Sequence, residues 1–323
     1  MSKVPITPEM LNLISAIDIF KGMWPYHPAV ISGALGPIRM NVMAQTIGAT
    51  LRFEGMNADD NHIYQFLTSS LTSIGGNIHE DAIKGLVFTL DNLNVNSTDF
   101  LFFPDAVRKI HKHLMQFSSL HYPDFTIDED LEDLMTWTRN QLSGDVIHPL
   151  LIIGIFMVVF LSIDPYQVGQ IRLAHCLGFL LFDLAGYGFV FYGALVSFFE
   201  KDKDAYTNAL LATQESLSHV APHYTPWLVF FLRRLKDLTM ELRGTLEEQL
   251  SASKGTKGLS ERIVSLLRVH NNLSISQFAV LTGANRNTLK KKLATLCEDS
   301  IIQAQGAGKS TRYISSLMLQ SDA

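Results

Sequence analysis

Residues 163–175 (IDPYQVGQIRLAH) place ionisable side chains between two strongly apolar stretches. Asp164, Arg172 and His175 are of types that can exchange a proton or carry a charge. Gly169 allows a tight turn of the backbone at this point. The segment could therefore be the turn of a membrane hairpin, the loop of a buried helical core or an active site.

The lengths of the two apolar stretches favour a buried helical core over a membrane hairpin. Residues 149–163 number 15, whereas a helix needs about 20 to span a bilayer. Residues 176–199 are long enough, but they include Asp183 and several small residues that favour close packing. Because a helix that is apolar all round is typical of the centre of a bundle, we expect no membrane partner. Membrane association through residues 149–199 stays as an alternative.

Most of the chain before residue 250 has helical periodicity. Apolar residues recur every three or four positions in residues 106–117, 128–142 and 227–250, and alternating strand patterns are rare before residue 300. The sequence therefore predicts a mainly α protein with a helical body at residues 1–250. The small, polar stretch SASKGTKG at residues 251–258 is predicted to be a linker.

The pattern after the linker is typical of a small DNA-binding domain. Helices are predicted at residues 259–270, 275–282 and 287–298, followed by a β-hairpin within residues 301–314. This order resembles the winged helix-turn-helix domains of bacterial regulators, which predicts one such domain at residues 259–323. The third helix and the hairpin then offer candidate DNA-binding residues: Arg286, Asn287, Thr288, Lys290, Lys291, Lys309 and Arg312.

The charge distribution supports a nucleic-acid partner for this domain. Residues 254–323 hold ten Lys or Arg and four Asp or Glu, a balance of +6, while the rest of the chain carries −11 within a net charge of −5. A basic module on an acidic body is compatible with DNA binding. The alternative is a winged helix that contacts a protein, with the lysines as an ordinary solvated face.

Composition argues against disulfides, secretion and a resident metal. Cys176 and Cys297 form no framework and have no metal-ligand spacing, and no basic start with an apolar run opens the chain, so a cytoplasmic protein is expected. The spacing of His111, His113 and His121 does not suit a metal site on one helix face, and Pro222 separates His219 from His223.

The string HPLLIIGIFMVVFLSIDPYQVGQIRLAHCLGFLLF resembles the central helix-loop-helix of the Fic (Fido) family, whose signature is HPFxxGNGRxxR. Members are α-helical and typically transfer AMP from ATP to a target hydroxyl. TLRFEG at residues 50–55 resembles the family's inhibitory motif [ST]xxxE[GN], and further similarities follow in the family's order. The resemblance implies a Fic-type domain with an inhibitory helix region near residues 40–60, containing Thr50, Glu54 and Gly55, and a core at about residues 100–245.

The resemblance also implies which functional groups are kept and which are replaced. The nucleotide or anion site would comprise Gly169, Gln170, Arg172 and His175, and Asp164 stands where the family has its catalytic His. Val168 stands where the family has the acid that holds the metal, Ile171 where it has a second Gly, and His175 where it has a second Arg. Residues 116–121 are too few for the hairpin that docks the target. Base, metal ligand and half of the charge clamp are thus replaced together, which predicts loss of AMP transfer.

The resulting hypothesis is a degenerate Fic-type protein with a regulatory or binding role and a winged helix that binds DNA or a protein. The alternative is an active nucleotidyl- or phospho-group transferase with altered chemistry that uses Asp164 and Arg172. ATP and Mg²⁺ are expected as cofactors only if the site still functions. The resemblance implies that Glu54 contacts His175 as a remnant of the inhibitory motif, with an ordinary helix end at Glu54-Gly55 as the alternative. A homodimer stays open.

Overall fold

The computed structural model describes residues 4–27, 30, 35–68, 78–96, 104–118, 129–144, 146–163, 169–256, 258–269, 272–282, 284–299, 301–306 and 311–315. The chain divides into two compact units, which are described separately. The first comprises Met1–Lys21 and Ile38–Glu241, and the second Gly22–Pro37 and Leu242–Ala323. Asp164 and Val168, two of the positions discussed above, lie outside the described residues, as does Lys309.

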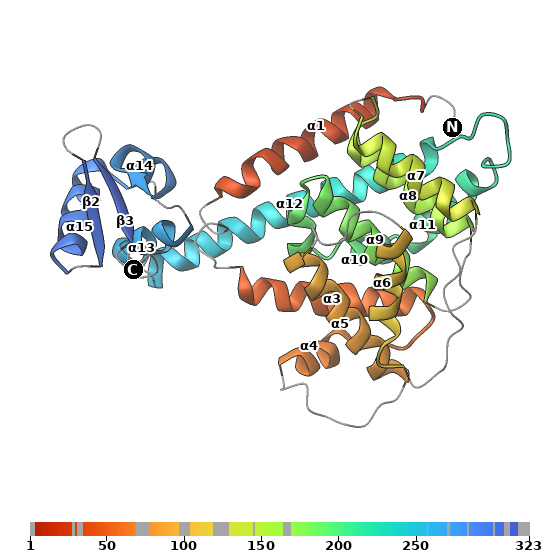
Figure 1. Ribbon diagram of the computed structural model, residues 1–323, viewed down its shortest axis with the longest axis horizontal. Helices are drawn as coiled ribbons and strands as arrows, with labels where there is room; N and C mark the ends of the chain where they lie inside the picture. The colour runs from red at the N-terminus through yellow and green to blue at the C-terminus, as the bar shows by residue number, and fades with distance from the viewer. Residues whose placement is uncertain are drawn as a thin grey trace. The chain divides into compact units, whose positions relative to one another are not determined.

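Helices build the first unit, which confirms the mainly α fold class (Figure 1). Three of them, α1, α3 and α12, also extend into the second unit. A short 3₁₀ turn lies at Gly188–Tyr192 (η3) in the first unit, and another lies at Trp24–Tyr26 (η1) in the second. The α-helices are α1 Pro8–Met23, α3 Gly36–Phe53, α4 Asp60–Thr68, α5 Ile78–Asn96, α6 Pro104–Met115, α7 Glu129–Leu142, α8 Pro149–Ile163, α9 Gln170–Leu184, α10 Leu195–Lys201, α11 Lys203–Gln214 and α12 Thr225–Thr256.

The apolar helices α8 and α9 form the core of the first unit, as the sequence predicts. Every residue of α8 from Leu150 to Val158 is buried, and so is every residue of α9 from Arg172 to Phe182. Trp227 of α12 donates its indole N–H to the carbonyl of Gly154 at 2.7 Å. A methyl group at Gly154 would lie 2.7 Å from Leu228, so glycine lets α12 approach α8 closely. Among the described helices, none is both long and apolar enough to cross a membrane.

The second apolar stretch is divided between several elements. α9 ends at Leu184, and Gly186 has a φ of 79°, a left-handed conformation that ends a helix. The chain then forms η3 before it starts α10. The stretch at residues 176–199 is therefore apolar because it lies in the core, and its length does not correspond to one helix.

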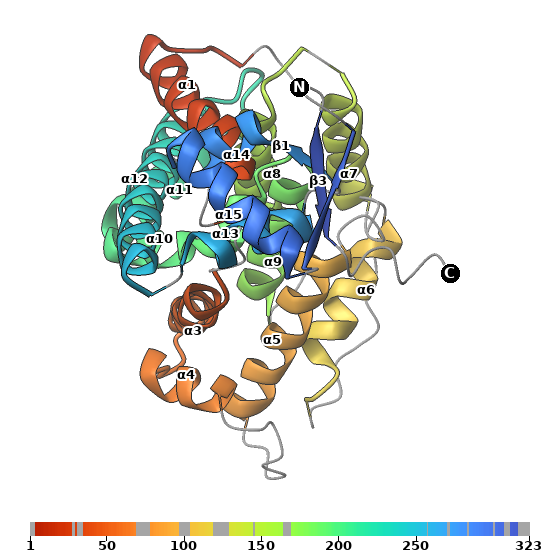
Figure 2. The ribbon, with the colours of Figure 1, turned by 90° about the vertical axis from the view of Figure 1, so that its left-hand side faces the viewer.

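Apart from η1 and the ends of α1, α3 and α12, the described part of the second unit contains three complete helices and a small sheet (Figure 2). The helices are α13 Leu259–Val269, α14 Ile275–Thr282 and α15 Arg286–Glu298, at the places predicted from the sequence. The strands β2 Ile302–Gln305 and β3 Arg312–Ser315 pair antiparallel, with Ala304 opposite Tyr313. A third strand, β1 Leu273–Ser274, pairs with the other edge of β3 and was not predicted. The apolar core of this unit includes Leu267, Leu273, Phe278, Leu289, Leu293 and Ile302.

The structure differs from the sequence prediction of a linker at residues 251–258. α12 runs without a break to Thr256, so residues 251–256 are helical, and the two units divide between Glu241 and Leu242. Polar composition alone does not end a helix, because extending an existing helix costs little when no proline intervenes. Leu242 and Leu246, one turn apart and both buried, continue the apolar stripe past the unit boundary.

Candidate functional site

Helix α9 is preceded by Gly169, whose backbone conformation strains any other residue. Gly169 is the N-cap of α9, with a φ of 82°, and its carbonyl accepts the N–H of Leu173 at 2.9 Å. A Cβ at Gly169 would lie 2.3 Å from Cε of Met115 and 3.3 Å from Nη2 of Arg172. The left-handed backbone is what favours glycine here, since the terminal methyl of Met115 belongs to a flexible side chain that can move aside. The first N–H groups of α9 have no acceptor within the helix, and they attract anions.

The carboxylate of Glu54 occupies this helix start. Its Oε1 accepts the backbone N–H of Arg172, the third residue of α9, at 3.1 Å. Its Oε2 lies 2.8 Å from Nε of the Arg172 guanidinium. The side chains of Arg172 and Glu54 are only 4% and 10% exposed. A buried pair of opposite charges therefore fills the place where the resemblance implies an anion.

The end of α3 delivers Glu54 to this position. Gly55 has a φ of 77°, the N–H of Met56 bonds to the carbonyl of Leu51 at 3.0 Å, and that of Gly55 bonds to Arg52 at 3.1 Å. These two bonds are those of a Schellman motif, which ends a helix at a left-handed glycine. Glu54-Gly55 is thus a helix end and also the source of the carboxylate on Arg172, so both readings of the motif apply.

Arg52 anchors the same turn to two neighbouring helices. Its guanidinium holds both carboxylate oxygens of Glu200 on α10, at 2.5 and 2.8 Å. Its Nη1 donates to Asp60 on α4 and to the carbonyl of Ala58, both at 2.7 Å. Hydrogen bonding to Glu200 is the largest cause that raises the pKa of Arg52 above its ordinary value. The sequence analysis missed this residue, although it lies inside the TLRFEG motif.

His175 lies beside Thr50 and not beside Glu54, which corrects the expected contact. Its Nδ1 is 3.1 Å from Oγ1 of Thr50, and both residues are buried. The ring of Phe53 meets the imidazole edge to face, with centroids 6.0 Å apart. Burial lowers the pKa of His175 to about 4, so the ring is neutral at pH 7. Glu54 pairs with Arg172 and not with His175, because a buried carboxylate is stabilised by a permanent positive charge, which a buried imidazole does not supply.

Two further groups near Arg172 are kept uncharged. Burial and, secondly, the charge of Arg172 lower the pKa of His111 on α6. Burial raises the pKa of the Cys176 thiol to about 12, so it does not form a nucleophilic thiolate at neutral pH. Nε2 of Gln170 lies 3.5 Å from the carbonyl oxygens of Phe160 and Leu161 near the end of α8. Arg172 is thus the charged group that α9 contributes here.

In the part of the chain that the structure describes, no group of three or more His, Cys, Asp or Glu side chains could hold a metal ion.

The candidate DNA-binding residues of α15 share an exposed surface. Arg286, Asn287, Thr288, Lys290 and Lys291 are all exposed, while Leu289, Leu293 and Leu296 face the core of the unit. Asn285, which the sequence analysis did not single out, caps the helix by accepting the N–H of Asn287 at 2.8 Å.

Arg312 on β3 is exposed but engaged by neutral acceptors. Its Nη1 donates to Asn272 at 2.9 Å and contacts Gln277 at 3.4 Å. Both acceptors are uncharged, so the positive charge of Arg312 is not cancelled. Within the described parts of the second unit, no acid forms an ion pair with Arg312 or with the basic residues of α15.

Comparisons with known proteins identify the fold. Neither a family model nor a curated protein sequence matches this chain. Among solved structures, it is similar to the crystal structure of a Fic family protein from Desulfovibrio desulfuricans G20 at 2.70 Å resolution. The TM-score is 0.60 at 18% identity, over 97% of this chain and 98% of that chain. The chain therefore has the fold of a Fic family protein, and its chemistry has to be argued from its own residues.

Proposed function

We propose that this protein is a regulator built on the Fic fold that no longer transfers a nucleotide. The observation that carries the proposal is the occupation of the α9 N-terminus by Glu54. Arg172 supplies one positive charge, Glu54 cancels it, and His175 is neutral at pH 7 because burial lowers its pKa to about 4. Among the described side chains of this site, no net positive charge remains for a triphosphate, whose binding depends on charge neutralisation. The replaced base, metal ligand and second Gly at Asp164, Val168 and Ile171 agree with this.

Nucleotide transfer is tested with ATP labelled on its α-phosphate, in the presence of Mg²⁺. Wild-type protein and the variant Glu54→Gly should both show no self-labelling and no labelling of added proteins. Glu54→Gly matters because it leaves Arg172 without its internal counter-ion. Labelling by either protein that disappears in Asp164→Ala would overturn the proposal in favour of a transferase with altered chemistry.

We propose that residues 259–323 act as a winged helix that binds DNA and so carry out the regulatory role. We also propose that the protein is cytoplasmic. The support is the exposed basic surface of α15, which forms no ion pair among the described residues, together with the antiparallel pair β2 and β3 in the place of a wing. A helix of this kind reads the major groove with the residues at its start, here Arg286, Asn287 and Lys290. Phosphate contacts from Lys291 and Arg312 would fix its position on the duplex.

The DNA proposal is tested by selection from a random duplex library with the full-length chain. A short, enriched sequence motif is expected, and Asn287→Ala should relax the preference at one position of that motif. Enrichment that Asn287→Ala, Lys290→Gln and Lys291→Gln leave unchanged would contradict the assignment of α15 as the reading helix. If the full-length chain retained no duplex at low salt, DNA would be excluded as the partner. A protein partner for the winged helix would then be the remaining proposal.

A further inference from the structure

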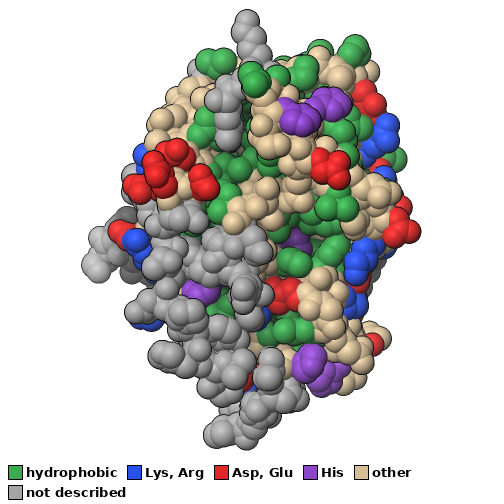
Figure 3. Space-filling view, turned by 90° about the vertical axis from the view of Figure 1, so that its right-hand side faces the viewer, with side chains coloured by type: hydrophobic (Ala, Val, Ile, Leu, Met, Phe, Trp, Pro, Cys, Tyr) green, Lys and Arg blue, Asp and Glu red, His purple; other side chains and the backbone are tan. Residues whose placement is uncertain are grey.

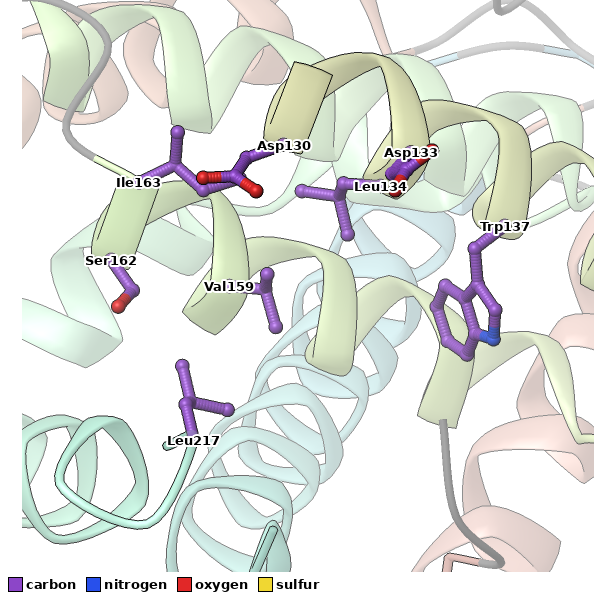
Figure 4. A pocket seen from close by; sticks show the side chains of 8 residues that line it. All are labelled: Asp130, Asp133, Leu134, Trp137, Val159, Ser162, Ile163 and Leu217. Carbon is purple, nitrogen blue, oxygen red and sulfur yellow. The ribbon is translucent and has the colours of Figure 1, made fainter. Parts of the chain in front are cut away.

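A hollow of about 650 Å³ lies in the first unit, between α7, α8 and the turn that follows α11 (Figure 4). Its size is within the range of small-molecule sites, roughly 300–1,000 Å³. It belongs to neither the Glu54–Arg172 pair nor the second unit. Its described lining consists of Asp130, Asp133, Leu134, Trp137, Val159, Ser162, Ile163 and Leu217.

The lining combines an apolar floor with an acidic and aromatic rim. Leu134 is buried, and Val159, Ile163 and Leu217 are half-buried, so the floor is made of aliphatic side chains. Asp130 and Asp133 are exposed on α7, and Trp137 follows them one turn further along the same helix. Figure 4 shows the two carboxylates and the indole along α7, with Val159 and Ile163 on the neighbouring helix α8.

The negative charge of this rim is not neutralised within the described chain. None of the ion pairs involves Asp130 or Asp133. Glu129 and Glu132 are also exposed on the first turn of α7, but they lie outside the lining of the hollow. Figure 3 shows Asp and Glu side chains in several separate groups on the face of the molecule that it presents, with hydrophobic side chains between them. A hollow lined by one sign of charge concentrates ligands of the opposite sign.

We propose that this hollow binds a short aliphatic di- or polyamine. Asp130 and Asp133 are three residues apart on one helix, a spacing that brings side chains within about 5–6 Å at their Cβ atoms. Two ammonium groups joined by a short methylene chain match that spacing. The methylenes pack on Leu134, Val159 and Ile163, which removes apolar surface from water. An ammonium group over the indole of Trp137 gains a cation–π contact.

The lining fits an organic cation better than a metal ion. Magnesium and calcium need several oxygen ligands in a compact shell, and here an indole and aliphatic side chains take most of the wall. A bare cation would leave the apolar floor exposed to water. An alkylamine covers that floor and meets the carboxylates at the same time, so shape and charge select it together.

The test is a calorimetric titration of the full-length protein with spermidine at low salt. Saturable binding is expected, and Asp130→Asn or Asp133→Asn should each weaken it about threefold, as is usual for an exposed charge contact. Glu132→Gln is the matched control, because it removes the same charge from an exposed position of α7 outside the lining. Its affinity should stay close to that of the wild type. Thermal melts of all variants check folding.

Tryptophan fluorescence locates the bound amine independently. The chain has three tryptophans, and Trp227 is fully buried. Spermidine should change the emission of the wild-type protein, and the change should disappear in Trp137→Phe. A change that persists in this variant would place the amine elsewhere and overturn the assignment.

Three other outcomes would also overturn the proposal. The first is no saturation up to about 10 mM spermidine, an affinity too weak for a built site. The second is equal weakening by Glu132→Gln and by the two lining variants, which indicates diffuse charge attraction only. The third is tighter binding of a lysine-containing peptide or of Mg²⁺ than of spermidine, which assigns the hollow to a basic peptide or to a metal.

Discussion

At the start of α9, the guanidinium of Arg172 and the carboxylate of Glu54 are both removed from water. Burying either charge alone would cost several kcal/mol, and the pair is stable because each neutralises the other. The N–H of Arg172 adds a hydrogen bond to Glu54 at 3.1 Å. This arrangement makes the carboxylate a stand-in for an external anion.

The variant Glu54→Gln should unfold more easily and should regain stability from a small anion. Removing one partner of a buried ion pair costs about 3–5 kcal/mol, because the other charge stays buried and unpaired. Millimolar pyrophosphate should restore part of this loss by taking the place of the carboxylate at the helix start. Chemical denaturation with and without pyrophosphate measures both effects.

Glu132→Gln controls for the general effects of charge and salt, since Glu132 is exposed on α7 and belongs to none of the ion pairs described. It should leave the free energy of unfolding almost unchanged and show no response to pyrophosphate. If Glu54→Gln gained no more from pyrophosphate than this control, the carboxylate would be a structural partner only.

His175 should make the protein less stable as the pH falls from about 6.5 to about 4. Burial lowers its pKa in the folded chain to about 4, whereas the unfolded chain binds the proton near 6.5. Protons therefore favour the unfolded state throughout this window, and the stability present above pH 6.5 is lost as the pH drops. The difference corresponds to about 3 kcal/mol.

The measurement is the free energy of unfolding of wild type and His175→Gln at a series of pH values. The variant should lose less stability than the wild type between pH 6.5 and 4. His62→Gln, at an exposed position of α4, should follow the wild-type curve. Parallel curves for all three proteins would show that His175 does not stay neutral in the folded chain.

At the scale of elements, the position of Glu54 depends on how α3 ends. The Schellman turn at Gly55 sets the direction of the chain, and Arg52 ties that turn to α10 through Glu200 and to α4 through Asp60. Gly48 belongs to the same arrangement, because a methyl group there would lie 1.9 Å from Oδ1 of Asp60. Helices α3, α4 and α10 together therefore hold the carboxylate of Glu54 against the start of α9.

Arg52→Gln should loosen this turn and expose the amide of Arg172. That amide is in the first turn of α9 and its acceptor is Glu54, so its protection from exchange depends on α3. Hydrogen exchange of the peptide around residues 169–173 should accelerate about tenfold, which corresponds to a local loss of ~1.4 kcal/mol.

Arg39→Gln is the matched control for this experiment. It breaks another ion pair of α3, that with Asp91 at 2.6 Å, at the opposite end of the helix. Exchange around Arg172 should not change in this variant. Equal acceleration in both variants would mean that α3 loosens as a whole and that Arg52 has no particular role at Glu54.

At the scale of the whole molecule, the charges are divided between a basic end and an acidic remainder. Residues 254–323 carry +6 and the other residues −11. Such a division allows one part of a chain to approach DNA while the rest is repelled by it. The basic side chains of α15 are exposed and free of acidic partners in the described residues, so they can release counter-ions from phosphates.

The affinity for duplex DNA should fall steeply with salt, and less steeply once α15 loses its lysines. Each phosphate contact contributes about −0.9 to the slope of log affinity against log salt, so Lys290→Gln with Lys291→Gln should reduce the slope by about 2. Fluorescence anisotropy over a range of salt concentrations measures it. The control is the double variant Lys109→Gln with Lys112→Gln on α6, which removes the same charge and should leave the slope unchanged. If both double variants had the same slope, a DNA contact at Lys290 and Lys291 would be contradicted.

The amino-acid sequence by itself determined which segments are helical and where the apolar core lies. The periodicity of α6, α7 and α12, the unbroken apolarity of α8 and the order of elements after residue 259 are local properties, and local patterns are readable along a chain. The family resemblance also implied that Thr50 and Glu54 lie near the loop that contains Gly169 and Arg172, but it gave His175 as the expected partner of Glu54. Residues 251–256 of the predicted linker are helical for a local reason too, since a polar stretch can simply extend a helix.

The tertiary structure alone decided which of these residues meet and in what charge state. Glu54 could have faced His175 or Arg172, which lie one turn apart on α9; the buried environment selects the guanidinium because it stays charged where the imidazole does not. The anchoring of Arg52 by Glu200 joins residues 148 positions apart, and the hollow beside Asp130 and Trp137 needs α7, α8 and Leu217 together. Partners distant in the chain and the burial that sets their protonation are products of packing, and no local pattern contains them.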